Sequence, residues 1–278
     1  MKYTVLGAKG FIGTQVALLA RRLGHDVFCP ARDEQLDGRH LDHVIYTIGL
    51  TADFRTRPFD TVTAHVTKLQ EILTRTSFDS LVYLSSTRVY SRCDGMATPA
   101  AEDAAIPVLS SDFSDLYNLS KLMGESIALA SGPHVKAARL SNVFGPDFES
   151  DNFLTSVIRD CVQRGHVELR TSLESAKDYV AVEDVAEILL RLSTGGSHRI
   201  YNVASGVNTT HREIVERLSQ LTGASVTVAD DSPLVTFPTI DISRLRTDLN
   251  FTPRCFDEML PALVASFRDY DPQQTSRV

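Results

Sequence analysis

The sequence predicts an α/β protein whose main domain is a doubly wound parallel sheet, joined to a smaller C-terminal domain. Short apolar runs alternate with amphipathic helical stretches through the first half of the chain, as in a parallel sheet that helices cover on both faces. A glycine-rich turn joins the first apolar run to the first helical stretch. With 278 residues, the chain can form one large domain or two closely joined ones.

The predicted elements follow this alternation. The strands expected in the first half are residues 3–6, 26–29, 43–48, 80–85 and 134–140. The helices between them are residues 11–23, 59–74 and 116–130, where apolar side chains recur at helical spacing. The second half is expected to contain helices at 152–164, 211–222 and 256–267, a strand–helix unit at 178–192 and a strand at 199–203.

The interval between the second and the third predicted strand is short. Only about a dozen residues separate the second predicted strand from the third, fewer than a full strand–helix–strand crossover requires. Either one strand of the sheet is missing there, or a very short strand passes near residues 36–40. We therefore expect a sheet that is truncated at this edge.

Charge and cysteine usage narrow the class of protein. The formal net charge of -7, without any run of Lys or Arg, argues against a nucleic-acid or anionic-membrane partner. The four cysteines are widely spaced and include no C-x-x-C pair, which fits reduced thiols. The sequence has no signal-peptide pattern and no apolar run long enough to span a membrane. We therefore expect a cytoplasmic protein.

Histidines suggest a metal site only weakly. His40 and His43 are three apart with Asp42 beside them, a spacing that fits one helical face. No cysteine or further carboxylate cluster accompanies them, so we interpret the segment as a polar loop before a strand and expect no metal.

The segment after the first predicted strand reads Leu-Gly-Ala-Lys-Gly-Phe-Ile-Gly over residues 6–13. Its glycines permit a tight turn, a close approach of the backbone to a ligand, and close packing of helix on strand. The helix N-terminus presents free N–H groups to an anion. The pattern predicts a dinucleotide pyrophosphate site in a Rossmann-like fold, and a structural turn without a ligand is the alternative. The cofactor-binding residues expected here are Gly7, Lys9, Gly10, Phe11, Ile12 and Gly13.

The end of the second predicted strand bears on which dinucleotide is bound. An acidic residue there would accept the ribose hydroxyls of NAD, but Ala31 occupies the position and Arg32 follows it. Arg32 and Lys9 favour NADP, because two cations can pair with its 2′-phosphate. NAD stays open, since Asp33 or Glu34 could take the ribose at this truncated, adenosine-side edge.

Tyr117 and Lys121 lie four apart in a predicted helix and therefore share one face. A phenol has an ordinary pKa of about 10, so it needs a neighbouring cation to act as a base at neutral pH. Lys121 can supply that charge and also hold the ribose of a nicotinamide cofactor. Tyr117 is then expected to exchange a proton with a substrate hydroxyl or carbonyl as a hydride moves.

A third catalytic residue is expected where a buried-type strand ends in hydroxyl side chains. Residues 81–87 read Leu-Val-Tyr-Leu-Ser-Ser-Thr, and such sheets bind ligands at the carboxyl ends of their strands. Ser86 would donate a hydrogen bond to the reacting oxygen. Its neighbours Ser85 and Thr87 are the alternatives for this role, and hydroxyls that merely satisfy the strand end are the structural interpretation.

The chain resembles the extended short-chain dehydrogenase/reductases, the NAD-dependent epimerase/dehydratase family of nucleotide-sugar-modifying enzymes. Besides the glycine turn and the Ser–Tyr–Lys set, further segments match the family in order over nearly the whole length. They are residues 139–146, 177–186, 201–206, 241–244 and 249–253.

The resemblance implies a Rossmann domain of residues 1–145 plus 174–204 and a substrate domain of residues 146–173 plus 205–278. It also implies a nucleotide diphosphate sugar as substrate, and a homodimer formed through helices that could include residues 59–74 and 116–130. By the same resemblance, Asp178 and Asp184 are structural, with Asp184 capping a helix. The substrate-side candidates are Thr87, Asn142, Asn152 and Lys177, and capping or turn formation is the alternative for the two asparagines.

Departures from the family pattern narrow the reaction. Where family dehydratases carry an Asp-Glu pair after the strand hydroxyl, this chain has Thr87 and Arg88, so dehydration is disfavoured. Lys177 replaces an Arg that could bind a pyrophosphate bidentately. His65 replaces the usual Asn of the helix after the third main strand. These changes leave the sugar open.

Three functions remain. The leading one is a reductase or epimerase of a nucleotide sugar, with NADP favouring net reduction and tightly bound NAD favouring epimerisation. A reductase of a non-sugar carbonyl is the second, and an apolar substrate pocket would support it. A non-catalytic NAD(P) sensor is the third, but the intact Tyr–Lys pair argues against it.

Overall fold

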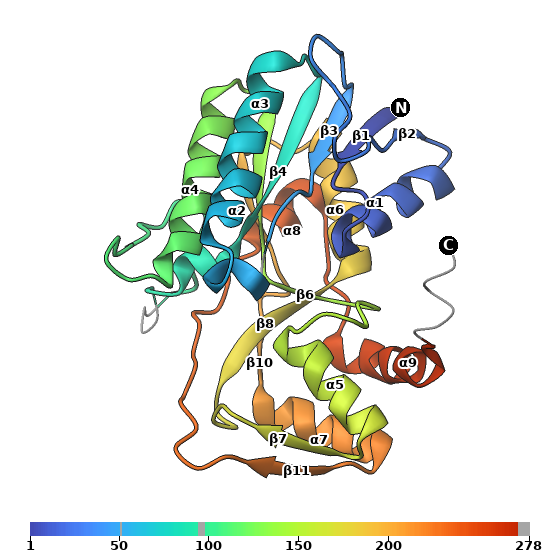
Figure 1. Ribbon diagram of the computed structural model, residues 1–278, viewed down its shortest axis with the longest axis vertical. Coiled ribbons are helices and arrows are strands. Elements are labelled where there is room, and N and C mark those ends of the chain that lie inside the picture. The colour runs from blue at the N-terminus through green and yellow to red at the C-terminus, as the bar shows by residue number, and fades with distance from the viewer. Residues whose placement is uncertain (51, 94–97, 272–278) are drawn as a thin grey trace.

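The computed structural model describes residues 1–50, 52–93 and 98–271 of the chain, and it confirms the predicted α/β fold. A six-stranded sheet forms the upper part of the molecule in Figure 1, and a smaller lobe lies below it. All strand pairs in this sheet are parallel. Its order is β2 (Asp26–Phe28), β1 (Lys2–Leu6), β3 (His43–Tyr46), β4 (Ser80–Ser86), β5 (Val135–Leu140) and β9 (Ile200–Val203).

Helices cover both faces of the sheet (Figure 1). On one face α1 (Phe11–Arg22) packs on α6 (Val182–Thr194), and their apolar sides share a core with β1, β3 and β4. On the other face lie α3 (Lys68–Arg75) and α4 (Asp115–Ala130), whose Leu69 and Ala128 belong to a second core. The apolar stripe of each helix is therefore buried against the sheet, as the helical spacing in the sequence predicts.

The helix expected over residues 59–74 is interrupted by a turn of wider helix. It consists of α2 (Pro58–Val62), a π-helical turn (Thr63–Thr67) and α3. Two buried tyrosines of the sheet donate hydrogen bonds to carbonyls of this turn: Tyr46 to Ala64 at 2.6 Å and Tyr83 to His65 at 3.2 Å. Turns of this kind commonly mark functional sites, and this one presents His65 toward α4.

The sheet ends at β2, so the expected truncation is present. No strand forms within residues 29–42, all of which are described; His40 makes only an isolated bridge to Ser77. The first of the two alternatives for this interval is therefore right: a strand is missing. Because β1 lies between β2 and β3, the chain changes direction across the sheet at β1 and β3, which is where such sheets open a crevice for ligands.

The smaller lobe has its own apolar core, formed where α5 (Phe153–Gln163), α7 (His211–Thr222) and α9 (Phe256–Asp269) pack together. The sequence predicted only one of its short strands, at the start of the strand–helix unit expected at residues 178–192. One sheet joins β6 (Asn142–Phe144), β8 (Ala176–Ala181) and β10 (Asn208–Thr210), and another joins β7 (His166–Leu169) and β11 (Ser225–Val228). The domain boundaries expected from the sequence stay a prediction, and residues 272–278 of the second domain lie outside the described part.

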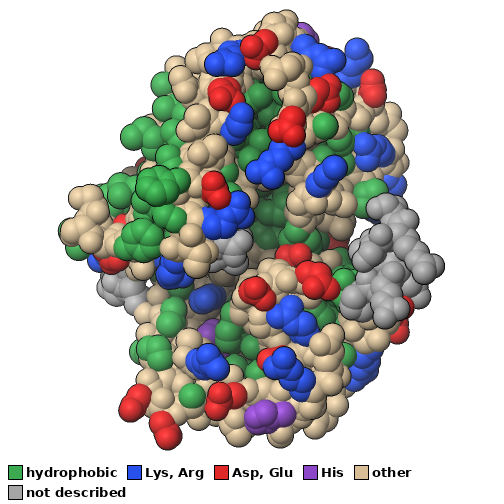
Figure 2. All heavy atoms as spheres, viewed as in Figure 1, with side chains coloured by type: hydrophobic (Ala, Val, Ile, Leu, Met, Phe, Trp, Pro, Cys, Tyr) green, Lys and Arg blue, Asp and Glu red, His purple; other side chains and the backbone are tan. Residues whose placement is uncertain are grey.

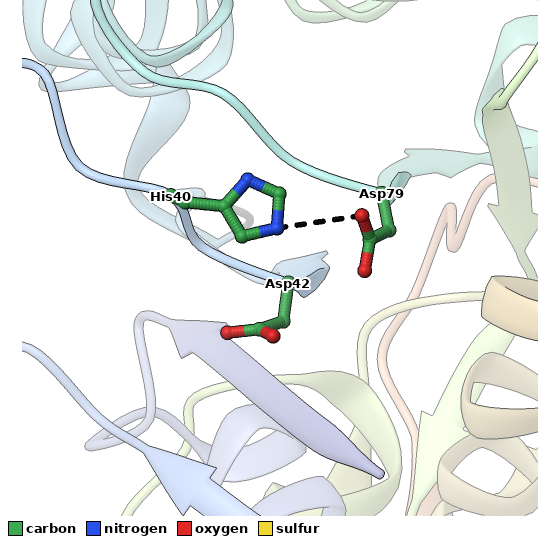
Figure 3. A group of neighbouring side chains, drawn as sticks. All are labelled: His40, Asp42 and Asp79. Atoms are coloured by element: carbon green, nitrogen blue, oxygen red, sulfur yellow. Dashed lines mark ion pairs between the residues drawn. The ribbon is translucent and has the colours of Figure 1, made fainter.

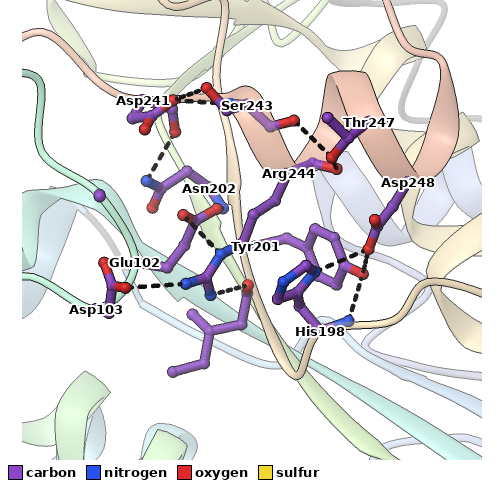
Figure 4. A network of polar contacts seen from close by, with 12 residues as sticks. Glu102, Asp103, His198, Tyr201, Asn202, Asp241, Ser243, Arg244, Thr247 and Asp248 are labelled. Carbon is purple, nitrogen blue, oxygen red and sulfur yellow. Dashed lines mark hydrogen bonds and ion pairs between the residues drawn. The ribbon is translucent and has the colours of Figure 1, made fainter.

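A polar network ties the unpredicted helix α8 (Ser243–Leu249) to β9 (Figure 4). Asp248 accepts hydrogen bonds from Tyr201 at 2.5 Å and from Ser197, and these bonds hold the pKa of its carboxyl well below the ordinary value. Arg244 pairs with Glu102 at 3.3 Å and donates to the carbonyl of Ile200. The network thus anchors the C-terminal segment on the edge strand of the main sheet.

The two aspartates of the 177–186 segment have different roles from one another. Asp178 accepts hydrogen bonds from the backbone N–H groups of Ser205, Gly206 and Val207, so it is structural, as expected. Asp184 does not cap α6, because Ala181 holds the N-cap position and no side chain caps the helix. Asp184 instead binds the backbone N–H and the guanidinium of Arg254, so the prediction of a cap is wrong.

The four cysteines are free thiols. In the part of the chain that the structure describes, no helix combines the length and the apolar character that a membrane crossing requires.

Candidate active site

A cavity of about 570 Å³ opens at the carboxyl ends of the central strands. The main sheet contributes the glycine turn, the end of β3 and the end of β4 to its wall. The opposite wall comes from the segment around Asn152, from β8 and from a loop that contains Phe237. The cavity therefore lies between the two lobes, at the position where the sequence predicts the ligands.

The glycine turn has the geometry that a close-packed strand–helix junction requires. Gly7 has a φ of +88°, and a Cβ on Gly13 would lie 2.4 Å from the carbonyl oxygen of Gly7. A Cβ on Gly10 would meet nothing closer than 3.4 Å. Helix α1 begins at Phe11 without a side-chain cap and without an acidic residue in its first turn. Its N-terminal N–H groups thus remain available to an anion.

The structure separates the predicted cofactor residues into two groups. Gly10, Phe11, Ile12 and Gly13 line the cavity. Gly7 lies beneath the turn, close to Thr47, while Lys9 and Arg32 are exposed and stand outside the cavity wall.

Ser86 and Tyr117 meet at the floor of the cavity. Ser86 is the last residue of β4, and its Oγ accepts a hydrogen bond from the backbone N–H of Arg88 at 3.1 Å. The Ser86 hydroxyl is hydrogen-bonded to Tyr117, a residue that is 4% exposed near the start of α4. Burial raises the pKa of the Tyr117 phenol, while the hydrogen bond from Ser86 and the charge of Arg88 lower it. Ser85, in contrast, is buried and its Oγ has no partner among the described residues.

Lys121 lies one helical turn beyond Tyr117. Its Nζ donates to the carbonyl oxygen of Leu84 at 2.9 Å and lies 5.9 Å from the centroid of the Tyr117 ring. Burial lowers the pKa of Lys121 to about 7, and the nearby carboxylate of Glu125 opposes that shift. A lysine whose pKa is near neutrality can carry a charge or release a proton within the cavity.

His65 supports this pair from the π-helical turn. The Ser120 hydroxyl donates a hydrogen bond to the carbonyl of Tyr117, so its oxygen accepts a hydrogen bond from Nδ1 of His65 at 2.8 Å. Nε2 of His65 accepts the backbone N–H of Leu50 at 3.3 Å. The imidazole is therefore the neutral Nδ1–H tautomer, and burial together with the charge of Lys121 lowers its pKa to about 2. The sequence identified His65 only as a departure from the family pattern.

Arg88 also reaches the cavity, although it was not among the predicted site residues. It belongs to a 3-10 turn (Thr87–Tyr90) that begins directly after Ser86. Its guanidinium carbon lies 5.2 Å from the ring centroid of Phe54 and 6.0 Å from that of Tyr117. The signal that could have found it is its place two residues beyond the catalytic hydroxyl candidate.

The substrate-side candidates all line the cavity, and two of them also have structural partners. Asn142 donates to the carbonyl of Asp178 at 2.9 Å, and Asn152 caps α5 by accepting the N–H of Thr155 at 2.9 Å. The ammonium of Lys177 lies 5.9 Å from the ring centroids of both Phe153 and Phe237. Thr87 is buried at the cavity wall.

A separate group of potential metal ligands lies at the opposite end of the sheet from the cavity. His40, Asp42 and Asp79 have ligand atoms within 4.8 Å of one another, and Figure 3 shows His40 facing Asp79. Nε2 of His40 lies 3.3 Å from Oδ1 of Asp79, and both side chains are exposed. We assign this group no role in metal binding.

Comparisons with known proteins agree with the fold and with the resemblance. GDP-6-deoxy-D-mannose reductase of Pseudomonas aeruginosa is 29% identical over 174 residues, which are 59% of this chain and 55% of that protein, so the match spans about half the length of the relative. The structure of MoeE5 in complex with UDP-glucose and NAD superposes with a TM-score of 0.79, 23% identity, and coverage of 97% of this chain and 99% of that one.

The structure of RMD from Pseudomonas aeruginosa complexed with NADPH also gives a TM-score of 0.79, with 19% identity and coverage of 97% of this chain and 99% of that one. The family model described as "NAD dependent epimerase/dehydratase family" matches residues 3–204. The chain therefore belongs to the NAD-dependent epimerase/dehydratase family.

Proposed function

We propose that this protein transfers a hydride between a nicotinamide dinucleotide and a carbinol or carbonyl carbon of a nucleotide diphosphate sugar, with Tyr117 as the proton donor and acceptor. The observation that carries the proposal is the meeting of Ser86, Tyr117 and Lys121 at the floor of a cavity that the glycine turn also lines. The polar and basic side chains in the wall, Lys177 and Arg88 among them, favour a sugar over an apolar ketone.

The glycine turn fits the pyrophosphate of such a dinucleotide. The uncapped N-terminus of α1 faces the cavity, and the space beside Gly10 admits a close approach of the backbone to the ligand. When bound, NAD(P) supplies the hydride donor or acceptor. Lys121 is placed to hold the ribose that carries the nicotinamide, because its Nζ reaches the carboxyl end of β4.

The protein's own residues handle the proton. Because the Ser86 oxygen accepts the N–H of Arg88, its hydroxyl proton is free to donate toward the phenol of Tyr117 or a substrate oxygen. This donation and the neighbouring cations stabilise the phenolate, which then takes a proton from a substrate hydroxyl during oxidation. During reduction, the neutral phenol returns that proton to the oxygen of the former carbonyl.

We favour a reductase that uses NADP over an epimerase that recycles NAD. Lys9, in the glycine turn, and Arg32, in the loop after the edge strand β2, are both exposed, and two cations can pair with a 2′-phosphate. Glu34, one of the alternatives for the ribose, is engaged by the N–H of Ala31 at 3.1 Å and by Arg39 at 2.7 Å. A reductase among the relatives and NADPH in the RMD structure agree with this choice. Thr87 and Arg88 provide no carboxylate for the loss of water, which argues against dehydration.

The test is Tyr117→Phe, with Tyr3→Phe as the matched control because Tyr3 is a buried tyrosine outside the cavity wall. We expect Tyr117→Phe to lower turnover by at least about 100-fold and to leave dinucleotide binding unchanged. Tyr3→Phe should retain turnover. Normal turnover in Tyr117→Phe would contradict the proposal. Denaturing the purified protein and identifying the released nucleotide by mass separates the two reactions, since stoichiometric NAD points to an epimerase.

We also propose a homodimer. Hydrophobic side chains gather at the left of the upper half in Figure 2, on the side where Figure 1 places α2 and α4. Phe59 of α2 is 85% exposed and Met123 of α4 is 53% exposed. Large exposed apolar patches usually mark interfaces. Phe59→Asp should therefore convert a dimer to a monomer in size-exclusion chromatography with light scattering, and a monomeric wild type would contradict the prediction.

A further inference from the structure

Arg88 has a partly buried charge that forms no ion pair within the described part of the chain. Its guanidinium donates one hydrogen bond, from Nη2 to the carbonyl of Ser114 at 3.3 Å. Its Nε is enclosed and has no partner among the described residues. A guanidinium has five N–H donors, and a charge removed from water is unfavourable unless an opposite charge compensates it. Most of the hydrogen-bonding capacity of Arg88 is thus unused.

The nearest carboxylates are bound elsewhere. Asp115 accepts hydrogen bonds from Nε of Arg92 at 2.6 Å and from the N–H of Leu109 at 2.8 Å. Asp112 is paired with the same Arg92. Arg92 therefore forms ion pairs with both carboxylates next to the start of α4, and Arg88 forms no ion pair within the described residues.

The surroundings of Arg88 add positive charge to this end of the cavity. Arg55 stacks on the other aromatic neighbour, with its guanidinium 4.5 Å from the Phe54 centroid. Lys177 lies in the same cavity, and its pKa is lowered by burial and by the charge of Arg88. Three aspartates also line the wall. Asp151 pairs with Arg159 at 3.4 Å, Asp178 accepts hydrogen bonds from three backbone N–H groups, and burial raises the pKa of Asp147.

We propose that Arg88 binds a carboxylate carried by the sugar ring next to the reacting carbon, so that the preferred substrates are nucleotide-linked uronic acids. The guanidinium stands beside Tyr117, where the reacting oxygen is placed, and its flat fork matches a carboxylate bidentately. Lys177, on β8, remains available for the diphosphate on the far side of the ring. The inference rests on the proposed function and specifies that the sugar of the substrate carries a negative charge.

The test compares ligands that differ only in this carboxylate. Binding to the enzyme saturated with dinucleotide is measured by calorimetry for UDP-glucuronic acid against UDP-glucose, UDP-galacturonic acid against UDP-galactose, and GDP-mannuronic acid against GDP-mannose. We expect the uronic acid of at least one pair to bind about tenfold or more tightly than its neutral partner. Arg88→Met should abolish the preference while retaining the neutral sugar, and Arg88→Lys should keep part of it. Lys68→Gln, which removes an exposed charge outside the cavity, should leave it unchanged.

The outcomes separate the inference from the function on which it rests. Equal binding of both members of every pair that binds overturns the role of Arg88 alone. An equal loss for both members in Arg88→Met overturns it as well, because it means that Arg88 contacts the diphosphate. If no ligand of either kind binds, the nucleotide-sugar function fails and the inference fails with it. Dinucleotide binding and the melting temperature of each variant show whether it is folded.

Discussion

Arg139 on β5 and Glu125 on α4 form a bidentate ion pair that is almost completely shielded from solvent. The distances are 2.9 Å from Nε to Oε1 and 2.7 Å from Nη2 to Oε2, and the side chains are 4% and 5% exposed. The remaining Nη1 of Arg139 donates to the hydroxyl of Tyr90 and to the carbonyl of Glu102. The pair thus fixes the catalytic helix to the sheet one turn beyond Lys121, and its carboxylate partly opposes the lowering of that lysine's pKa by burial.

Glu125→Gln should destabilise the protein strongly, because it leaves the charge of Arg139 buried without a counter-charge. We expect the free energy of unfolding to fall by about 3–5 kcal/mol, measured by denaturant unfolding. The double variant Glu125→Leu with Arg139→Met removes both charges and should recover part of that loss. If the double variant is no more stable than Glu125→Gln, an uncompensated charge is not the cause.

Lys121 should reduce stability at neutral pH. Burial lowers its pKa from the ordinary 10.5 to about 7 in the folded chain, so between these two values the unfolded chain binds more protons. Stability therefore rises with pH through this window, and the unfavourable contribution of Lys121 is fully present below it. In Lys121→Met, stability should therefore rise less steeply with pH through this window than in the wild type. The variant should also melt at a higher temperature than the wild type at pH about 7.

The matched control is Lys68→Met, which removes an exposed lysine that pairs with Glu71. Unfolding is followed at several pH values from about 7 to about 10.5. Lys68→Met should keep the wild-type slope, and an unchanged slope in Lys121→Met would contradict the prediction.

The main sheet could be predicted because most of its strands lie next to a long periodic helix in the sequence. The strands of the smaller lobe, such as β6 and β10, have only three residues each, and no periodic pattern is detectable in so short a run. They form because tertiary pairing with β8 supplies their hydrogen bonds. The π-helical turn at Thr63–Thr67 likewise depends on the tyrosine hydroxyls that meet it from the sheet.

The residues of the candidate site likewise divide into those that the sequence alone identifies and those whose importance depends on tertiary contacts. Ser86, Tyr117 and Lys121 stand at positions where chemistry and spacing coincide, so the sequence alone singles them out, and their catalytic roles stay predictions. Arg88 was noticed only as a residue that replaces a carboxylate, because its interest depends on which acidic neighbours Arg92 has already bound. His65 depends on contacts with Leu50 and Ser120, which are distant in the sequence and meet only in the fold.

His65 should act as a positioning residue. His65→Phe fills the same space but leaves the N–H of Leu50 without its acceptor, so we expect the free energy of unfolding to fall by about 1–3 kcal/mol. Because the ring is hydrogen-bonded to Ser120 and is near enough to Lys121 for that charge to lower the His65 pKa, kcat should fall while KM for the sugar stays nearly constant. His65→Asn, which retains an acceptor and a donor, should recover part of kcat. A loss of stability with unchanged kcat in both variants would show a purely structural role.

Arg32 should decide between the two dinucleotides. Because the sheet ends at β2 and no strand forms within residues 29–42, Arg32 is exposed in the loop beyond an open edge, with no further strand to cover an adenosine ribose phosphate. Arg32→Ala should weaken NADPH binding about tenfold and leave NADH binding nearly unchanged, as followed by fluorescence titration at constant ionic strength. Arg22→Ala removes an exposed arginine at the end of α1 and serves as the control for net charge. An equal loss of affinity for NADPH and NADH would indicate that Arg32 contacts a part of the molecule that both dinucleotides have in common. The preference for NADP would then lose its physical basis.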